Sequence, residues 1–273
     1  MHNWLKTPPG QYLLGWENAL LEQMVTDVFG YHALQLGLPE WHALQANRMP
    51  HRWIAVSNAI NSIAEEAINT PDTEENTQKN NMFVADFVTN FEALPFSENS
   101  LDLLILPHSL ELSQDPHATL REAERVLVPE GRLIVCGFNP ISLWGLQQKR
   151  SHIYRKFNVG ELYLPEAGEF ISHWRLRDWL KLLNFELESS DFGCYRPAVR
   201  RQAMLQRFAW MDKVGSIYWP IFGAVYVVSA VKRVHGMRMI SPIRKLSKIT
   251  NTAPVSIAGK TINTLATSKN YLK

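Results

Sequence analysis

Residues 101–140, LDLLILPHSLELSQDPHATLREAERVLVPEGRLIVCGFNP, decide the fold. LDLLIL is a nearly continuous apolar run, which is typical of a strand covered on both faces of a sheet. Asp115 and Pro116 then provide an N-cap residue and a proline at the first helical position, and apolar residues follow at three- and four-residue spacing. A turn at 128–131 leads into a second apolar run, RLIVCGF. Two buried strands joined by a helix predict a parallel βαβ unit with a right-handed crossover.

The same stretch, with LPF at 94–96 before it, resembles a known family. In the type 11 group of class I S-adenosylmethionine (SAM)-dependent methyltransferases, which includes ubiquinone-biosynthesis-like enzymes, LPF precedes S-F-D, L-E-H, E-x-x-R-V-L and P-G-G. This chain carries them as LPFSENSLDLLIL, SLELSQDP and REAERVLVPEG. Glu130 replaces the first glycine of P-G-G, a change that we expect a type I turn over 128–131 to tolerate. The resemblance implies an α/β, Rossmann-like seven-stranded methyltransferase sheet, mostly parallel with one antiparallel strand and with helices on both faces.

Length and composition indicate one large domain followed by a tail. With 46% hydrophobic residues, the 273-residue chain can bury a sizeable core. We expect a single class I methyltransferase-like domain over 1–238 and a basic, flexible tail over 239–273, which holds few large apolar residues. Residues 214–231 carry no charge, but Pro220 and the β-branched end of this run favour a final antiparallel strand over a transmembrane segment.

Charge is distributed unevenly along the chain. Residues 1–212 hold 18 Lys/Arg and all 26 Asp/Glu, whereas 213–273 hold 10 Lys/Arg and no acidic residue. A basic end on an acidic body predicts contact of residues 232–273 with nucleic acid or an anionic surface, although a solvated tail explains the same composition. Two cysteines and no signal-peptide pattern indicate a reduced, cytoplasmic protein, and the nine scattered histidines lack the spacing of a metal site.

The resemblance implies that SAM lies at the loop after the first strand, which we expect over 31–37. LQLG at 34–37 aligns with the family's L-D-L-G, whose glycines let the backbone approach the methionine part of SAM. Gly37 keeps the first glycine. Gln35 replaces the acid that commonly serves the ammonium of SAM, and Pro39 and Trp41 replace the later glycines.

Other candidate residues follow the later strands. Asn58 lies 21 residues after Gly37, where nucleotide-binding sheets place an acid on the ribose. The resemblance implies a further acid at the adenine amino group, for which Asp86 and Glu92 are candidates. His108 follows the fourth strand, as a general base, a substrate contact or a structural histidine. The expected cofactor-binding residues are Gln35, Gly37, Leu38, Asn58, Asp86, Glu92, Ala93 and Pro107.

Two further segments resemble parts of the family. The N-terminal segment carries a Trp, a Thr, a Gly and a Glu in the order found in many small methyltransferases of this group, where it packs near the cofactor pocket, and a helix is expected over 11–28. These residues are Trp4, Thr7, Gly10 and Glu17. The segment after Pro140 often shapes the substrate site in the family, although surface packing explains its composition equally well. Its candidates are Trp144, Arg150, Tyr154 and Arg155.

Two functions follow from these patterns, and a third, a peripheral membrane protein, rests only on the basic tail and the apolar run of 214–231. The first is a SAM-dependent methyltransferase of unknown acceptor, with a small molecule favoured, because methyl transfer depends mainly on positioning. The second is a non-catalytic methyltransferase-fold protein that binds RNA or another polyanion. The altered loop residues Gln35, Pro39 and Trp41, together with Asn58, favour this second function.

Overall fold

The computed structural model describes residues 1–57, 85–155, 163–165 and 170–234. Met1–His235 form one compact unit. The predicted tail over 239–273 lies outside the described residues, so the boundary at 238 stays a prediction. Within the described helices, none combines the length and the apolar character needed to cross a bilayer.

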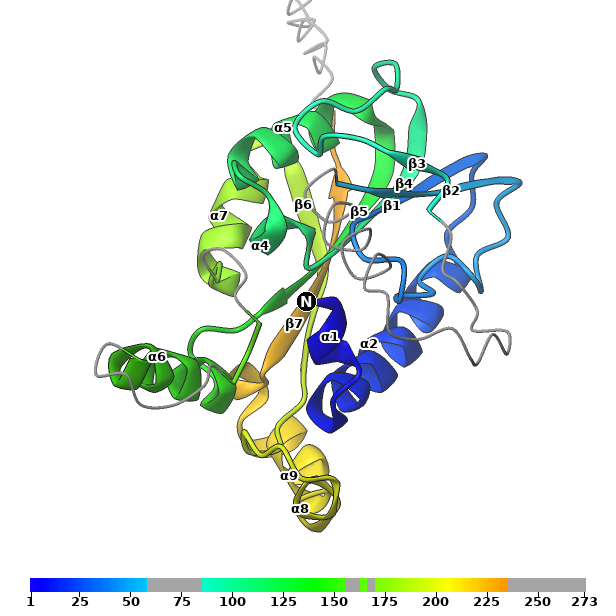
Figure 1. The fold of residues 1–273 in the computed structure, drawn as a ribbon. Coiled ribbons are helices and arrows are strands. Elements are labelled where there is room, and N and C mark those ends of the chain that lie inside the picture. The colour runs from blue at the N-terminus through cyan, green and yellow to red at the C-terminus, as the bar shows by residue number, and fades with distance from the viewer. Residues whose placement is uncertain (58–84, 156–162, 166–169, 235–273) are drawn as a thin grey trace, which may run out of the picture. The chain divides into compact units, whose positions relative to one another are not determined.

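Seven strands of the described chain form one sheet in the order β3-β2-β1-β4-β5-β7-β6 (Figure 1). Strand β7 is antiparallel to β5 and β6, and the remaining pairs are parallel. The strands are β1 (His32–Leu36), β2 (His51–Val56), β3 (Phe87–Val88), β4 (Leu101–Pro107), β5 (Leu127–Phe138), β6 (Phe185–Gly193) and β7 (Val225–Lys232). The predicted sheet, with its one antiparallel strand, is confirmed.

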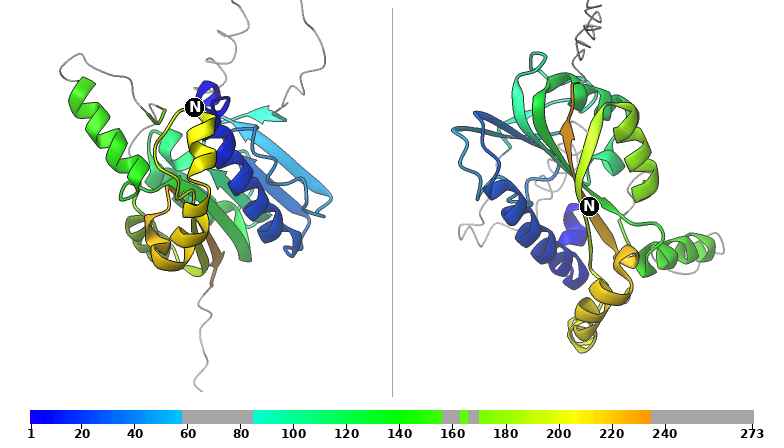
Figure 2. Two further views of the ribbon diagram at one scale, coloured as in Figure 1. Left: turned by 90° about the horizontal axis from the view of Figure 1, so that it is seen from below. Right: turned by 180° about the vertical axis from the view of Figure 1, so that it is seen from behind.

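Helices cover both faces of the sheet (Figure 2). They are α1 (His2–Leu5), α2 (Pro8–Thr26), α4 (Ser109–Leu112), α5 (Pro116–Val126), α6 (Leu143–Arg155), α7 (His173–Leu182), α8 (Gln202–Arg207), α9 (Trp210–Tyr218) and the 3-10 helix η1 (Pro220–Phe222). Helix α2 packs on one face through Leu13, Leu21 and Val25. Helices α5 and α7 pack on the other, where Leu120 and Leu176 are fully buried. Successive residues of β1, β4, β5 and β7 therefore point alternately into two hydrophobic cores, one on each face of the sheet.

The E-x-x-R and LPF motifs occur together because they bind each other. Glu122 accepts a hydrogen bond from the backbone N–H of Leu94 (2.7 Å) and pairs with Arg125 (2.6 Å). Arg125 donates to the carbonyl oxygens of Leu94 (3.3 Å) and Phe96 (2.9 Å). This pairing ties the segment before β4 to α5.

The ends of α5 confirm one prediction and correct another. Asp115 caps the helix, since its carboxylate accepts from the backbone N–H groups of His117 (2.9 Å) and Ala118 (3.1 Å). The type I turn over 128–131 is wrong: Glu130 has φ +66°, whereas a type I turn needs a negative φ at its third position. Pro129 keeps the second position at negative φ, and a negative φ followed by a positive φ matches a type II turn rather than type I. A glycine would suit Glu130's position better.

The segment before β7 is helical, which the sequence analysis did not predict. Residues 202–222 form α8, α9 and η1, and the strand begins only at Val225. The β-branched run at the end of 214–231 is a strand as predicted, but the aromatic run before it is helical. The sequence also predicts a strand over 82–88, of which the described residues show Phe87–Val88 as β3.

Candidate functional site

The candidate site lies where β1 and β4 end side by side. Here the strand order reverses, which is where open α/β sheets bind ligands. Gly37 follows β1 with φ +119°, and a Cβ added to it would lie 2.6 Å from Ser109 Oγ and 3.3 Å from the Pro107 oxygen. Ser109 donates its hydroxyl to the Leu36 carbonyl oxygen. Glycine is therefore required by both conformation and space, and the strand ends are in close contact.

A buried cluster of ionisable side chains lies beside the adjacent ends of β1 and β4. The ring of His108 has Nδ1 3.0 Å from Glu111 Oε2 and Nε2 3.1 Å from Glu17 Oε1. Glu17 also accepts from Trp41 Nε1 (2.5 Å), and Glu111 accepts from the backbone N–H of Phe138 (2.5 Å). The three ionisable side chains are at most 2% exposed. We call Glu17, His108 and Glu111 the buried triad; it joins α2 to the ends of β4 and β5.

The triad favours a charged imidazole. Burial opposes the charge, but the carboxylates of Glu17 and Glu111 outweigh it and raise the pKa of His108 to about 10. Burial raises the pKa of Glu111, with His108 acting against the rise. An imidazolium that donates from both nitrogens to carboxylates has no free nitrogen to accept a proton. This geometry supports a structural cation at His108 rather than a general base.

The N-terminal motif (Trp4, Thr7, Gly10 and Glu17) includes the turn between α1 and α2, and this turn positions Glu17 in the triad. Trp4 donates from Nε1 to the backbone carbonyl oxygen of Tyr163 (2.8 Å). The Thr7 hydroxyl donates to the backbone carbonyl oxygen of Trp4 (2.6 Å). A Cβ on Gly10 would collide with the backbone of Trp4 and of the following residue. Trp4, Thr7 and Gly10 therefore set the α1–α2 turn, and the fourth motif residue, Glu17, lies on α2.

The loop after β1 is filled by an indole and leaves one polar atom without a partner. Trp41 is wholly buried, with its ring centroid 5.4 Å from that of His108. Gln35 donates from Nε2 to the Leu38 oxygen (2.9 Å), which fixes the orientation of the amide. The buried Oε1 of Gln35 has no hydrogen-bond partner within the described structure. A free acceptor thus remains at the position where the resemblance places the acid.

A cavity of about 190 Å³ opens at the carboxyl ends of β2 and β3. Its lining consists of Ser57, Asn90, Phe91, Glu92, Leu112, Ser113 and Gln114. Glu92 is the only predicted cofactor residue among these. Asp86 instead accepts from the Ile54 N–H (2.7 Å), and the Ala93 oxygen accepts from Thr89 (3.3 Å). Asn58 lies outside the described residues.

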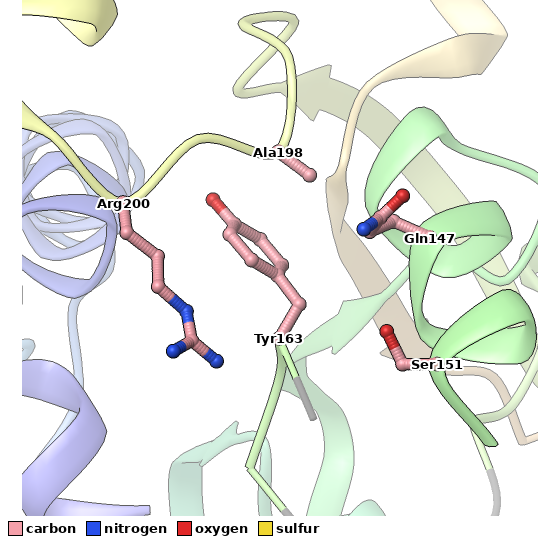
Figure 3. A pocket seen from close by; sticks show the side chains of 5 residues that line it. All are labelled: Gln147, Ser151, Tyr163, Ala198 and Arg200. Carbon is pink, nitrogen blue, oxygen red and sulfur yellow. The ribbon is translucent and has the colours of Figure 1, made fainter. Parts of the chain in front are cut away.

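A second cavity, of about 330 Å³, lies between α6 and the segment before α8. Its lining is Gln147, Ser151, Tyr163, Ala198 and Arg200, with the Tyr163 ring standing between Arg200 and the two α6 side chains (Figure 3). Trp144 is fully buried and donates to the Arg196 oxygen (2.8 Å), so it packs rather than lines this space. Arg150 is exposed. The side chains of Tyr154 and Arg155 lie outside the described structure.

The structure therefore gathers some predicted residues and separates others. The adjacent ends of β1 and β4 bring together Gln35, Gly37, Leu38 and Pro107. Glu92 lines the neighbouring cavity. The spacing before LPF had favoured the neighbourhood of Asn90–Glu92, but sequence reasoning missed Glu111 and the cavity residues Ser57 and 112–114. The L-E pair of the quoted SLELSQDP was the available signal for Glu111, since it stands three residues after His108.

Comparison with known proteins agrees with this architecture. Residues 56–135 match the family model described as a methyltransferase domain. A 100-residue segment is 44% identical to the uncharacterized protein YafS of Escherichia coli, covering 36% of this chain and 39% of that protein. A 173-residue segment is 30% identical to the ubiquinone/menaquinone biosynthesis C-methyltransferase UbiE of Ruegeria, covering 63% of this chain and 58% of that protein. The chain thus spans about half the length of these relatives.

Solved structures share the fold at low sequence identity. A chain of the Haloferax volcanii complex that contains the methyltransferase activator Trm112 has a TM-score of 0.52 and 17% identity, covering 86% of this chain and 96% of that one. A SAM-dependent methyltransferase of Thermotoga maritima has a TM-score of 0.50 and 16% identity, with 81% and 92% covered. Residues 56–135 are thus similar to a methyltransferase domain, and the chain shares its fold with SAM-dependent methyltransferases.

Proposed function

We propose that this protein binds SAM across the carboxyl ends of β1, β2 and β3 and transfers its methyl group to a small molecule. The cavity after β2 and β3 carries the proposal, because it is a polar space at the edge where this fold binds ligands. The relative named for ubiquinone and menaquinone biosynthesis makes small aromatic acceptors the first class to test.

The donor set of this cavity fits the adenosine part of SAM. Ser57 and Asn90 supply groups that donate and accept hydrogen bonds, Glu92 supplies an acceptor, and Leu112 supplies an apolar contact for a base. The unpartnered Oε1 of Gln35 fits an ammonium donor at the methionine end. SAM supplies an electrophilic methyl group when bound, and these side chains would hold and orient it.

Trp41 supports the second function, a methyltransferase-fold protein without catalysis. Its indole is fully buried and bonded to Glu17 at the loop position where the family has bare backbone. Moving this ring would leave Glu17 and His108 less well paired, which costs free energy in a buried site. A protein that no longer binds SAM would keep this ring in place permanently.

A charge substitution at Gln35 separates the two functions. Titration calorimetry of the wild type and Gln35→Glu with SAM and with 5′-methylthioadenosine, which lacks the ammonium, gives the comparison. If Gln35 faces the ammonium, the carboxylate should tighten SAM binding about tenfold through a charge-assisted hydrogen bond. Binding of methylthioadenosine should stay unchanged, since the adenosine contacts are the same.

Three other results would contradict the proposal in different ways. Equal effects on both ligands would place Gln35 away from the ammonium. No heat from either protein with either ligand at millimolar concentration would reject SAM binding and favour the non-catalytic function. Binding without methyl transfer to any acceptor would reject catalysis alone.

A further inference from the structure

The segment 202–222 exposes an unusual amount of apolar surface. Seven large apolar side chains of α8, α9, η1 and the residue between the last two point to solvent, with exposed fractions from 38% at Met204 to 74% at Ile217. We call them the apolar patch: Met204, Trp210, Ile217, Tyr218, Trp219, Ile221 and Phe222. Single exposed apolar residues are common on surfaces, whereas several large ones within one short segment indicate an interaction site.

The outward direction of these side chains is set by specific contacts. On α9, Gly215 faces inward against the ring of Tyr195, which leaves no room for a Cβ. Asp212 also faces inward and accepts from Arg196 (2.9 Å). Trp210 and Ile217, seven residues apart, therefore share the outer face. A helix on a globular protein ordinarily does the reverse and turns its apolar face inward.

The patch is held firmly to the sheet. Asn139, directly after β5, donates from Nδ2 to the Ile221 oxygen (2.7 Å) and the Gly223 oxygen (2.9 Å). Tyr195 donates its hydroxyl to the Pro220 oxygen (2.8 Å). These bonds fix η1 at the carboxyl end of β5. The apolar surface is thus a built feature at the edge that holds the candidate site.

The segment that carries the patch is rich in basic residues. Residues 196–222 contain five basic residues and one acidic residue, Asp212, which is paired with Arg196. Arg201, Arg207 and Lys213 are exposed on α8 and α9. Exposed Trp and Tyr beside Lys and Arg are the composition of surfaces that lie in the headgroup region of a membrane. Two copies of this patch facing each other would bring like charges together, which disfavours self-association.

We propose that the apolar patch docks on the surface of an anionic lipid bilayer. Ile217, Ile221 and Phe222 would enter the boundary between headgroups and acyl chains, while the flanking cations contact lipid phosphates. A nucleic acid would satisfy the cations and leave these three side chains exposed, so the lipid surface accounts for both features. This inference concerns 202–222 and is independent of catalysis.

Site-specific labelling tests the docking on the full chain. Cys136 and Cys194 are both buried, so a single introduced cysteine can be labelled selectively with an environment-sensitive nitrobenzoxadiazole dye. The test variant is Ile217→Cys, and the control is Leu182→Cys, which is 81% exposed at the end of α7. Vesicles contain phosphatidylcholine alone or equal parts of phosphatidylcholine and phosphatidylglycerol. We expect a blue shift for the label at 217 with the anionic vesicles only, and none at 182.

Substitution of the patch gives an independent measure. Ile217→Ser and Phe222→Ser should each lower partitioning onto the anionic vesicles about tenfold, and Leu182→Ser should leave it unchanged. Four results would overturn the proposal: no shift at 217; equal shifts at 217 and 182; a shift without vesicles that grows with protein concentration; or a shift produced by RNA instead. Vesicle binding that the serine variants leave intact would also overturn it, because residues outside the patch would then hold the membrane.

Discussion

Raising the pH should weaken the protein through His108. The unfolded chain has an ordinary imidazole pKa of about 6.5, whereas the buried triad raises the pKa of His108 to about 10 in the folded state. A raised histidine pKa contributes stability that is fully present below pH 6.5 and disappears as pH rises toward 10. Between these values the folded chain binds the extra proton, so the unfolding free energy falls by up to about 1.4 kcal/mol per pH unit.

Integrated from pH 6.5 to 8, this linkage amounts to a loss of about 2 kcal/mol. Burial raises the pKa of the Cys136 and Cys194 thiols, whose unfolded forms titrate mainly above this window. The measurement is urea denaturation followed by tryptophan fluorescence at pH 6.5, 7.25 and 8 at constant ionic strength. It yields the unfolding free energy at each pH directly.

The matched variant is Glu17→Gln with Glu111→Gln. Without either carboxylate, burial alone acts on His108 and keeps its imidazole neutral above pH 6.5, so the loss of stability over the window should disappear. His117→Gln, which removes an exposed imidazole, should behave like the wild type. An equal loss in the wild type and the double variant would refute a charged imidazole in the triad.

Further predictions concern the local structure, and urea denaturation measures each. Asp115→Ala should cost about 1 kcal/mol, because two backbone N–H groups at the start of α5 lose their acceptor. Glu130→Gly should add up to about 1 kcal/mol by relieving a positive φ, less the small contribution of its exposed ion pair with Arg233, and a net loss above about 1 kcal/mol would contradict the strain at this position. Gly10→Ala should cost about 1–3 kcal/mol through collision with the Trp4 backbone. Gly15→Ala, with nothing within 4 Å of the added carbon, should instead stabilise α2 by about 1 kcal/mol.

Local signals in the sequence were sufficient for β4, α5 and β5, and the family resemblance implied the rest of the sheet. Within 101–138, the Asp115 cap and the apolar runs all predict the same strand–helix–strand order. The structure has all three elements there. The turn after α5 shows the limit of such signals. Proline and glycine at the second and fourth positions suit a type I turn, but the φ of Glu130 depends on how β5 must turn to pair with β4.

The candidate site needed the tertiary structure. Glu17 and His108 are 91 positions apart, and their pairing depends on the α1–α2 corner and on the end of β4 reaching one place. In the sequence, Trp41 only replaces a glycine of the family's SAM-binding loop. Its burial against Glu17 became visible only once α2 was positioned.

The sequence by itself determined the fold class, since buried strands, helix caps and turns are specified by neighbours within a few residues. Only the tertiary structure decided which side chains face each other and which face solvent. The charge on His108 depends on carboxylates brought from α2 and α4, and the outward face of α9 depends on Gly215 packing against Tyr195. Both are properties of distance and burial in space, which separation along the chain does not set.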